Sequence, residues 1–251
     1  MRIYGQNVPM MASLLIWCGL WEVVGRLGLV FLLPPFTEVL AAIGEFAGRP
    51  TFWSATAITL RSFVVGMLLA ILVGVPLGIL MGRSKAADRL LGMWVNVFVS
   101  APLSALVPIL MILFGLGETT VTLAVFLFAV WIIALDARAG VGDMQRSLEE
   151  MALSYGASPA QLYGKIILWA ALPEILAGIR IGLIRGVKGV VIGQLLVSVI
   201  GYGELFELYS RNFLMAEFWA LTILLFAFAM LMAEGVELIE KRVAYYAGVR
   251  Q

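Results

Sequence analysis

The chain has 251 residues, of which 62% are hydrophobic and 13% are charged, and its net charge at pH 7 is +1. An ordinary soluble domain is about 45–50% apolar and about 25% charged, whereas the mean hydropathy here is +1.02. This composition excludes an ordinary soluble domain, and the near-zero net charge gives no indication of nucleic-acid binding. We therefore interpret the chain as an integral membrane protein, in which each spanning helix needs about 20 apolar residues.

Residue types that often carry chemistry are scarce. Histidine is absent, which removes a common metal ligand and the side chain that titrates nearest to neutral pH. Cys18 is the single cysteine, so no disulfide forms within the chain. The sequence also lacks the Gly-x-x-x-x-Gly-Lys-Ser/Thr loop that binds nucleotide phosphates. We expect no catalytic residue, no metal site and no cofactor on this chain.

The first predicted span covers roughly residues 8–27, most of which are uncharged. No small-x-small cleavage site follows, so we expect a retained span rather than a signal peptide. Glu22 and Arg26 lie four residues apart, share a helix face and can pair near the outer interface. A Pro-Pro pair then ends the helix, and we expect Thr37 to cap a short amphipathic surface helix that continues to Ala47.

The second predicted span is the uncharged run Ser62–Gly82, which is entered at Arg61. Pro76 is expected to kink this helix, because it removes a backbone hydrogen bond. Three small residues in the span would allow another helix to approach closely, namely Gly66, Gly74 and Gly78.

The third apolar run, Leu90–Gly117, is too long for one straight span. Its 28 residues would extend about 42 Å as a helix, beyond the roughly 30 Å of the hydrocarbon core. We predict an interruption near residues 101–103. Broken helices in a membrane need protein or water around the freed backbone groups, so we expect this segment to line a translocation path with Ser100, Pro102 and Ser104. A simple proline kink is the alternative.

The fourth predicted span is Thr119–Leu135, and four charged residues then introduce a loop: Asp136, Arg138, Asp143 and Arg146. Within that loop we predict two short helices. Gly156 suits the left-handed position that ends the first helix, Ser158 suits the cap of the second, and Pro159 suits its first turn. Such a bent pair of helices is suited to a groove on a partner protein.

The fifth predicted span begins at Pro173 and contains Arg180, Arg185 and Lys188 without an acidic residue between them. At 100° per residue these three cations fall within about 140° of arc. A cation at mid-membrane costs at least about 2.5–3.5 kcal/mol, so such residues usually face the bundle or a cavity. Two interpretations stay open. The cations neutralise Glu residues of other spans, with Arg180 reaching the cytoplasmic interface, or Arg185 and Lys188 attract an anionic substrate.

An acidic outer loop is predicted over Glu204–Glu217, and the core of the sixth span over Phe218–Ala233. With the N-terminus inside, ten Lys and Arg residues fall in cytoplasmic segments and four fall at the outside. Because positively charged loops stay in the cytoplasm, this count predicts that both termini and the loop after the fourth span are cytoplasmic.

The segment Glu149–Gly178 resembles the signature of inner-membrane permease subunits of ATP-binding-cassette importers. That signature is Glu-Ala-Ala, three residues, Gly, nine residues, Ile, one residue, Leu-Pro. The corresponding residues here are Glu150-Met151-Ala152, Gly156, Ile166 and Leu168. Met151 replaces an Ala and Trp169 replaces the Pro, while a later Leu172-Pro173 pair is similar to the nitrate/sulfonate/taurine branch. A chance match on an amphipathic loop is the alternative.

Two further stretches resemble the same branch. One is the Ala-Pro-Leu-Ser-Ala-Leu-Val-Pro sequence of residues 101–108 with the Phe-Gly-Leu-Gly-Glu sequence of residues 114–118. In the other, Gln194 stands where these permeases commonly carry Glu, ahead of Gly201-Tyr202-Gly203. Arg180 and Arg185 also fit the family pattern, whereas Lys188 is less typical.

The resemblance implies an all-α, polytopic membrane protein with six transmembrane helices and the type I importer permease fold, in a single domain over residues 1–251. It implies a bacterial inner-membrane location and a homodimer with the path at its interface. It also implies two cytoplasmic ATPase subunits, which bind ATP and Mg²⁺, and an extracytoplasmic substrate-binding protein. The loop at about residues 143–165 would couple to the ATPase.

The resemblance, together with the broken third span and the cations of the fifth span, assigns residues to these roles. Coupling to the ATPase is expected of Glu149, Glu150, Ala152, Gly156, Ala157 and Ser158. The translocation path is expected to include Ser100, Pro102, Ser104, Arg185, Lys188 and Gln194. The substrate would be a small organic anion such as a sulfonate, taurine, nitrate or an aromatic carboxylate. An ATP-independent transporter or channel is one alternative, opposed by the scarcity of acidic residues in the spans. A membrane enzyme or scaffold is another.

Overall fold

A computed structural model describes residues 2–3, 6–7, 10–197 and 199–247. Two short strands, β1 (Arg2–Ile3) and β2 (Gln6–Asn7), pair antiparallel, and the other regular elements described are helical. These are α1 (Met10–Arg26), α2 (Phe36–Phe46), α3 (Pro50–Arg83), α4 (Lys85–Ser100), η1 (Leu103–Leu106), α5 (Val107–Phe114), α6 (Glu118–Gly142), α7 (Arg146–Ser154), α8 (Pro159–Gln161), η2 (Leu162–Ile167), α9 (Leu168–Ala170), α10 (Leu172–Val197), α11 (Gly201–Arg211) and α12 (Met215–Ala247). The predicted all-α class is confirmed.

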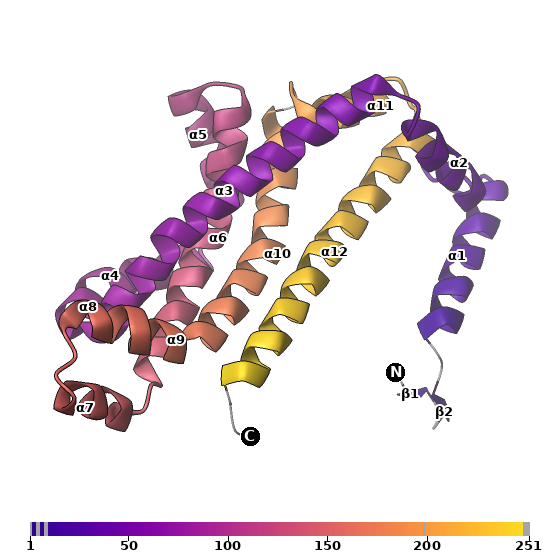
Figure 1. The fold of residues 1–251 in the computed structure, drawn as a ribbon. Helices are drawn as coiled ribbons and strands as arrows, with labels where there is room; N and C mark the ends of the chain where they lie inside the picture. Colours follow the sequence, from indigo (N-terminus) through magenta and orange to yellow (C-terminus); the bar gives the residue numbers. More distant parts are fainter. Residues whose placement is uncertain (1, 4–5, 8–9, 198, 248–251) are drawn as a thin grey trace.

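Helix α6 forms the centre of the bundle. It packs against α3 on one side and α10 on another, and α12 lies beside α10 (Figure 1). Its buried residues include Val121, Val125, Ala129 and Ile133, which repeat every four positions and form one continuous core with Phe63 of α3. Helices α1 and α2 lie at the far side of α12 in the same view.

Close packing of α3 on α6 follows from the glycines that the sequence singled out. A methyl group added at Gly66 would lie 2.7 Å from the carbonyl oxygen of Thr122, and one at Gly74 would lie 2.9 Å from that of Val130. A methyl group at Gly78 would overlap the carbonyl oxygen of Ala134. The prediction that these positions let another helix approach is therefore confirmed.

Within the described residues, two helices, α3 and α6, are each long and apolar enough to cross a membrane, and two bent helix pairs qualify if each pair is taken as one span. One bent pair is α4 with η1–α5, at 97°, and the other is α8–α9 with α10, at 63°. A shorter apolar stretch, Met215–Phe228, lies in α12. The number of six spans stays a prediction.

Several predicted boundaries were wrong. Helix α3 begins at Pro50, so Arg61 lies inside it and does not mark its start; an exposed Arg can pair at a helix surface without ending the helix, and Arg61 pairs with Glu118. Thr37 does not cap α2: Pro35 is the cap residue. The backbone N–H and the hydroxyl of Thr37 donate instead to Glu22, at 2.9 and 3.0 Å.

The C-terminal half is more helical than predicted. Asp136 and Arg138 lie within α6 rather than in a loop. The predicted outer loop is largely α11, whose buried face includes Leu205, Phe206 and Tyr209. These residues join a core with α2 and α12, which explains why a charged segment folds as a helix. The apolar core predicted for the last span is part of the longer α12.

Candidate coupling surface and translocation path

The bend between α7 and α8 forms as the sequence predicted. Gly156 adopts φ = +74°, a left-handed conformation that costs glycine little. The backbone N–H of Ser158 donates to Oε1 of Gln161 at 2.9 Å, and the N–H of Gln161 donates to Oγ of Ser158 at 3.4 Å. This reciprocal pair is a capping box, and Pro159 occupies the first turn. Local chemistry therefore fixes the angle between the two halves of the coupling loop, which we define as residues 143–165.

A small apolar core holds the coupling loop on the bundle. Ala152 and Leu162 are buried in the loop itself. They pack with buried residues of α6, of the last part of η2 and of the segment that leads into α10, namely Ala137, Val141, Ile167, Ala171 and Ile175. Ala157 is partly buried against the same core. The predicted coupling residues Ala152 and Ala157 thus help to pack the loop against the bundle.

The two adjacent glutamates of α7 have different surroundings. Glu149 accepts two hydrogen bonds from Arg83, at 2.6 and 2.7 Å. Glu150 is exposed. It lies among exposed apolar side chains of α7 and the following turn: Leu148, Met151, Leu153 and Tyr155, the last of which is 87% exposed. We call this set with Glu150 the α7 face. Clustered exposed apolar residues rimmed by charge mark interaction sites.

The ion pair between Arg83 and Glu149 was missed at the sequence level. From the sequence, Arg83 is one of the ten Lys and Arg residues of the predicted cytoplasmic segments. The two residues lie 66 positions apart, so no local spacing reveals that they meet. Both side chains are partly buried, with 28% and 22% of their surfaces exposed.

The predicted interruption of the third span is confirmed. Helix α4 ends at Ser100, Pro102 precedes the 3₁₀ turn η1, and the two helical parts meet at 97°. Ser100, Pro102 and Ser104 are all exposed at this break. Helix α10 contacts both η1 and α5, so the fold brings the break next to the helix that carries the three cations.

The three cations of α10 have three different settings. Arg180 forms an ion pair with Glu237 of α12, where the sequence predicted only that it reaches the cytoplasmic interface. Nη1 of Arg185 donates to the carbonyl oxygen of Val99 at 3.4 Å, which places its charge beside the C-terminal end of α4. Lys188 is exposed, three residues farther along α10. Arg185 is therefore near the break, whereas Arg180 is engaged elsewhere.

Gln194 is only 1% exposed. Its Nε2 donates to Oγ1 of Thr59 at 2.9 Å, and the backbone N–H of Tyr202 reaches the same hydroxyl at 3.2 Å. Any side-chain atom at Gly203 would overlap the backbone carbonyl of Gln194. Gln194, which the sequence predicts to line the path, is thus enclosed where α10, α3 and α11 meet.

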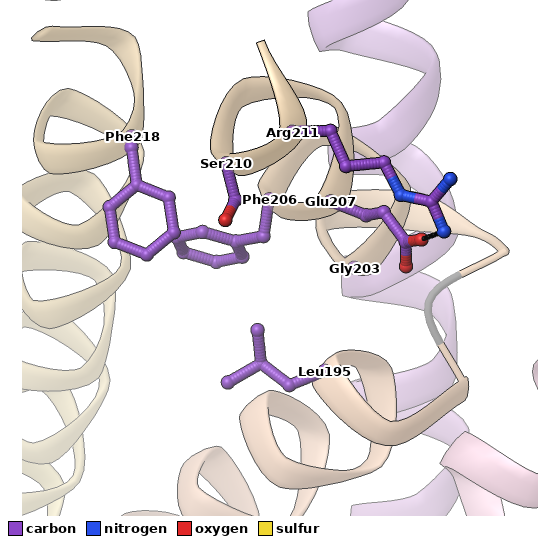
Figure 2. A pocket seen from close by; sticks show the side chains of 7 residues that line it. All are labelled: Leu195, Gly203, Phe206, Glu207, Ser210, Arg211 and Phe218. Carbon is purple, nitrogen blue, oxygen red and sulfur yellow. Dashed lines mark ion pairs between the residues drawn. The ribbon is translucent and has the colours of Figure 1, made fainter. Parts of the chain in front are cut away.

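A hollow of about 330 Å³ lies at the end of the bundle opposite to α7, between α10, α11 and α12. Figure 2 shows its lining, in which Glu207 and Arg211 form an ion pair on one side and Phe206 faces Phe218 on the other. Leu195 contributes from the end of α10. The sequence patterns do not predict this hollow, because it depends on α11 being a helix.

Comparison with protein families gives one match over most of the chain. Residues 74–245 match the family described as "Binding-protein-dependent transport system inner membrane component". The matched region begins inside α3 and ends inside α12, so it contains the interrupted span, the coupling loop and the cations of α10.

Curated relatives point in the same direction. The taurine transport system permease protein TauC of Escherichia coli (strain K12) is 31% identical over 247 residues, which cover 94% of this chain and 88% of TauC. The putative aliphatic sulfonates transport permease protein SsuC of Bacillus subtilis (strain 168) is 29% identical, with 73% of this chain and 67% of SsuC covered. Among solved structures, a chain of the MetNI methionine ABC transporter in an inward-facing conformation shares the fold. Its TM-score is 0.66 at 22% identity, over 78% of this chain and 98% of that one.

Proposed function

Because this chain belongs to the family of binding-protein-dependent transport system inner membrane components, we propose that it forms the path of an ATP-driven importer for a small organic anion. Family membership makes it a non-catalytic permease subunit, whose ATPase is a separate chain. The observation that carries the proposed coupling is the α7 face, an exposed apolar surface around Glu150 on a loop of fixed angle.

The α7 face would sit in a groove of the ATPase. Its apolar side chains leave water on docking, which favours association, and Glu150 adds a charge at the edge of the joint. Because Gly156 and the Ser158 cap fix the bend, the coupling loop would move as one body when ATP closes the ATPase pair. The spans would then rock between inward-facing and outward-facing arrangements.

The translocation path would run past the break between α4 and η1. Ser100 and Ser104 present hydroxyls there, and Arg185 brings positive charge to the end of α4. We propose that Lys188, which is exposed three residues farther along α10, adds to this charge. An anion is the ligand that such a setting favours. The relatives TauC and SsuC are named for taurine and aliphatic sulfonates, and we propose a substrate of this class. We assign Gln194 a structural role, because it is enclosed.

The proposed assembly is a homodimer in the bacterial inner membrane, with two cytoplasmic ATPase subunits and an external binding protein. We propose that each chain is one domain with six spans: α1, α3, α4 with η1–α5, α6, α10 and α12. The start of α1, the end of α12 and helix α7 lie at one end of the molecule, and α2, α5 and α11 lie at the other (Figure 1). This arrangement supports cytoplasmic termini together with a cytoplasmic coupling loop.

A charge reversal on the α7 face tests the coupling role. We expect Glu150→Lys to leave the spans folded but to reduce taurine uptake per ATP hydrolysed severalfold, because the joint with the ATPase is disturbed. The measurement uses the reconstituted transporter with its ATPase and binding protein. Glu38→Lys makes the same charge change at an exposed position of α2, at the opposite end of the molecule from α7, and should retain coupling. Unchanged coupling in Glu150→Lys, or no co-purifying ATPase with the unaltered chain, would contradict the proposal.

A further inference from the structure

One arginine contacts both halves of the coupling loop. Arg83 is the last residue of α3. Its Nη1 donates to Oε2 of Glu149 at 2.7 Å and its Nη2 donates to Oε1 at 2.6 Å, which joins it to α7. Its guanidinium carbon also lies 6.0 Å from the centre of the Tyr163 ring in η2. Glu149 precedes the Gly156 bend and Tyr163 follows it, so one side chain holds both halves of the loop.

The geometry of this contact fixes orientation as well as distance. A bidentate pair between a guanidinium and a carboxylate restricts rotation, because two parallel hydrogen bonds must both be kept. The cation–π contact with the Tyr163 ring adds a second, weaker restraint on the same group. Both members of the ion pair are more than two-thirds buried, so water competes less with it than with an open surface pair.

Apart from Arg83, helix α3 contributes little to the seating of the loop. The fully buried residues of the core beneath the loop come from the loop, α6 and the α9–α10 region, and α3 adds only the partly buried Val75 and Ile79. Yet α3 is packed closely on α6 along most of its length, through Gly66, Gly74 and Gly78. A displacement applied at the tip of α3 therefore acts on a tightly packed pair of helices.

We propose that Arg83 is a positioning residue of the transporter, which ties the coupling loop to the end of α3 so that movement of the loop displaces α3 and α6. This inference rests on the proposed function, because it assumes that an ATPase moves the loop. Arg83 lies outside the α7 face, so its loss should leave ATPase docking intact. Its loss should instead weaken the transfer of movement from the loop to the translocation path.

The test follows movement at the path without a need for the substrate. Cys18→Ala removes the single native cysteine, and Ser104→Cys places a reporter at the exposed break. We expect its labelling rate with a small aqueous thiol reagent to differ severalfold between the nucleotide-free complex and the complex trapped with Mg-ATP and vanadate. With Arg83→Gln or Glu149→Gln added, that ratio should fall toward unity while the ATPase still co-purifies. The exchanged pair Arg83→Glu with Glu149→Arg should restore part of it.

Arg138→Gln is the matched control, because Arg138 pairs with Asp88 of α4 at similar exposure but contacts α4 rather than the loop. It should keep the full labelling ratio. Three results would overturn the role of Arg83 and leave the proposed function standing. They are a full labelling ratio in Arg83→Gln, a fall of equal size in Arg138→Gln, and no restoration in the exchanged pair. Should the parent complex lack an ATPase or show no nucleotide-dependent labelling, the proposed function would fail first, and this inference with it.

Discussion

Among the glycines that the structure describes, Gly203 has the least space for a side chain. It stands at the start of α11, directly against the backbone of Gln194 in α10. The same junction contains the hydroxyl of Thr59, which links Gln194 to the backbone of Tyr202. Close backbone contact and buried hydrogen bonds therefore coincide at one point, where three helices meet. A glycine here is a packing requirement rather than a source of flexibility.

We expect Gly203→Ala to destabilise the folded protein by about 1–3 kcal/mol, because the added methyl group forces apart backbone that cannot move independently. The measurement is the thermal unfolding midpoint in detergent. Gly44→Ala is the control. A side chain at this position meets nothing within 4 Å, and the substitution replaces a poor helix former with a good one, so it should not lower the midpoint. Equal midpoints for Gly203→Ala and the unaltered protein would show that the junction is looser than its geometry indicates.

Helices α3 and α6 form the most extensive helix–helix contact in the described bundle. In a membrane, helices associate through close packing rather than through the hydrophobic effect, so small residues at the contact matter. We expect Gly78→Ala to lower the unfolding midpoint and Gly78→Leu to lower it further, because the larger side chain meets Ala134 and Ala137 of α6. Thermal unfolding of both variants in detergent measures this series. A loss that did not grow with side-chain size would argue against a direct steric contact.

The elements that the sequence predicted well are those set by local chemistry. Pro102 interrupts the third span, and Gly156 with Ser158 sets the bend of the coupling loop, because each residue acts on its own backbone. Helix α11 was mistaken for a loop, because its charges obscured an apolar face that becomes evident only against α2 and α12. The start of α3 at Pro50 could not be predicted from the uncharged run, because that run begins only after Arg61.

In the candidate site, too, features set by local sequence could be predicted, and features set by contacts between helices could not. The break in the third span could be expected from its length and its prolines, and the place of Glu150 on the coupling loop from the resemblance to importer permeases. The pairing of Arg83 with Glu149, the enclosure of Gln194 and the separate partner of Arg180 could not be expected, because each depends on which helices become neighbours. Sequence patterns thus located the coupling loop but did not show how it is attached.

At the scale of the whole molecule, the proposed mechanism requires a defined topology. An ATPase in the cytoplasm can move the coupling loop only if that loop is also cytoplasmic. Charge counting predicts this side, and the arrangement of α7 and α11 at opposite ends of the bundle agrees with it (Figure 1). The two ends can be distinguished directly, because exposed side chains are available at both.

We expect Tyr155→Cys, in a Cys18→Ala background, to react with a membrane-impermeant thiol reagent only after the inner membrane is opened. Tyr155 is 87% exposed, so burial would not explain protection in intact spheroplasts. Ser210→Cys, at the exposed surface of α11, should react without permeabilisation and serves as the matched position. Reaction of Tyr155→Cys in intact spheroplasts would place the α7 face outside the cell. A cytoplasmic ATPase could not then reach it. Both the proposed movement of the coupling loop by the ATPase and the role of Arg83 would be excluded.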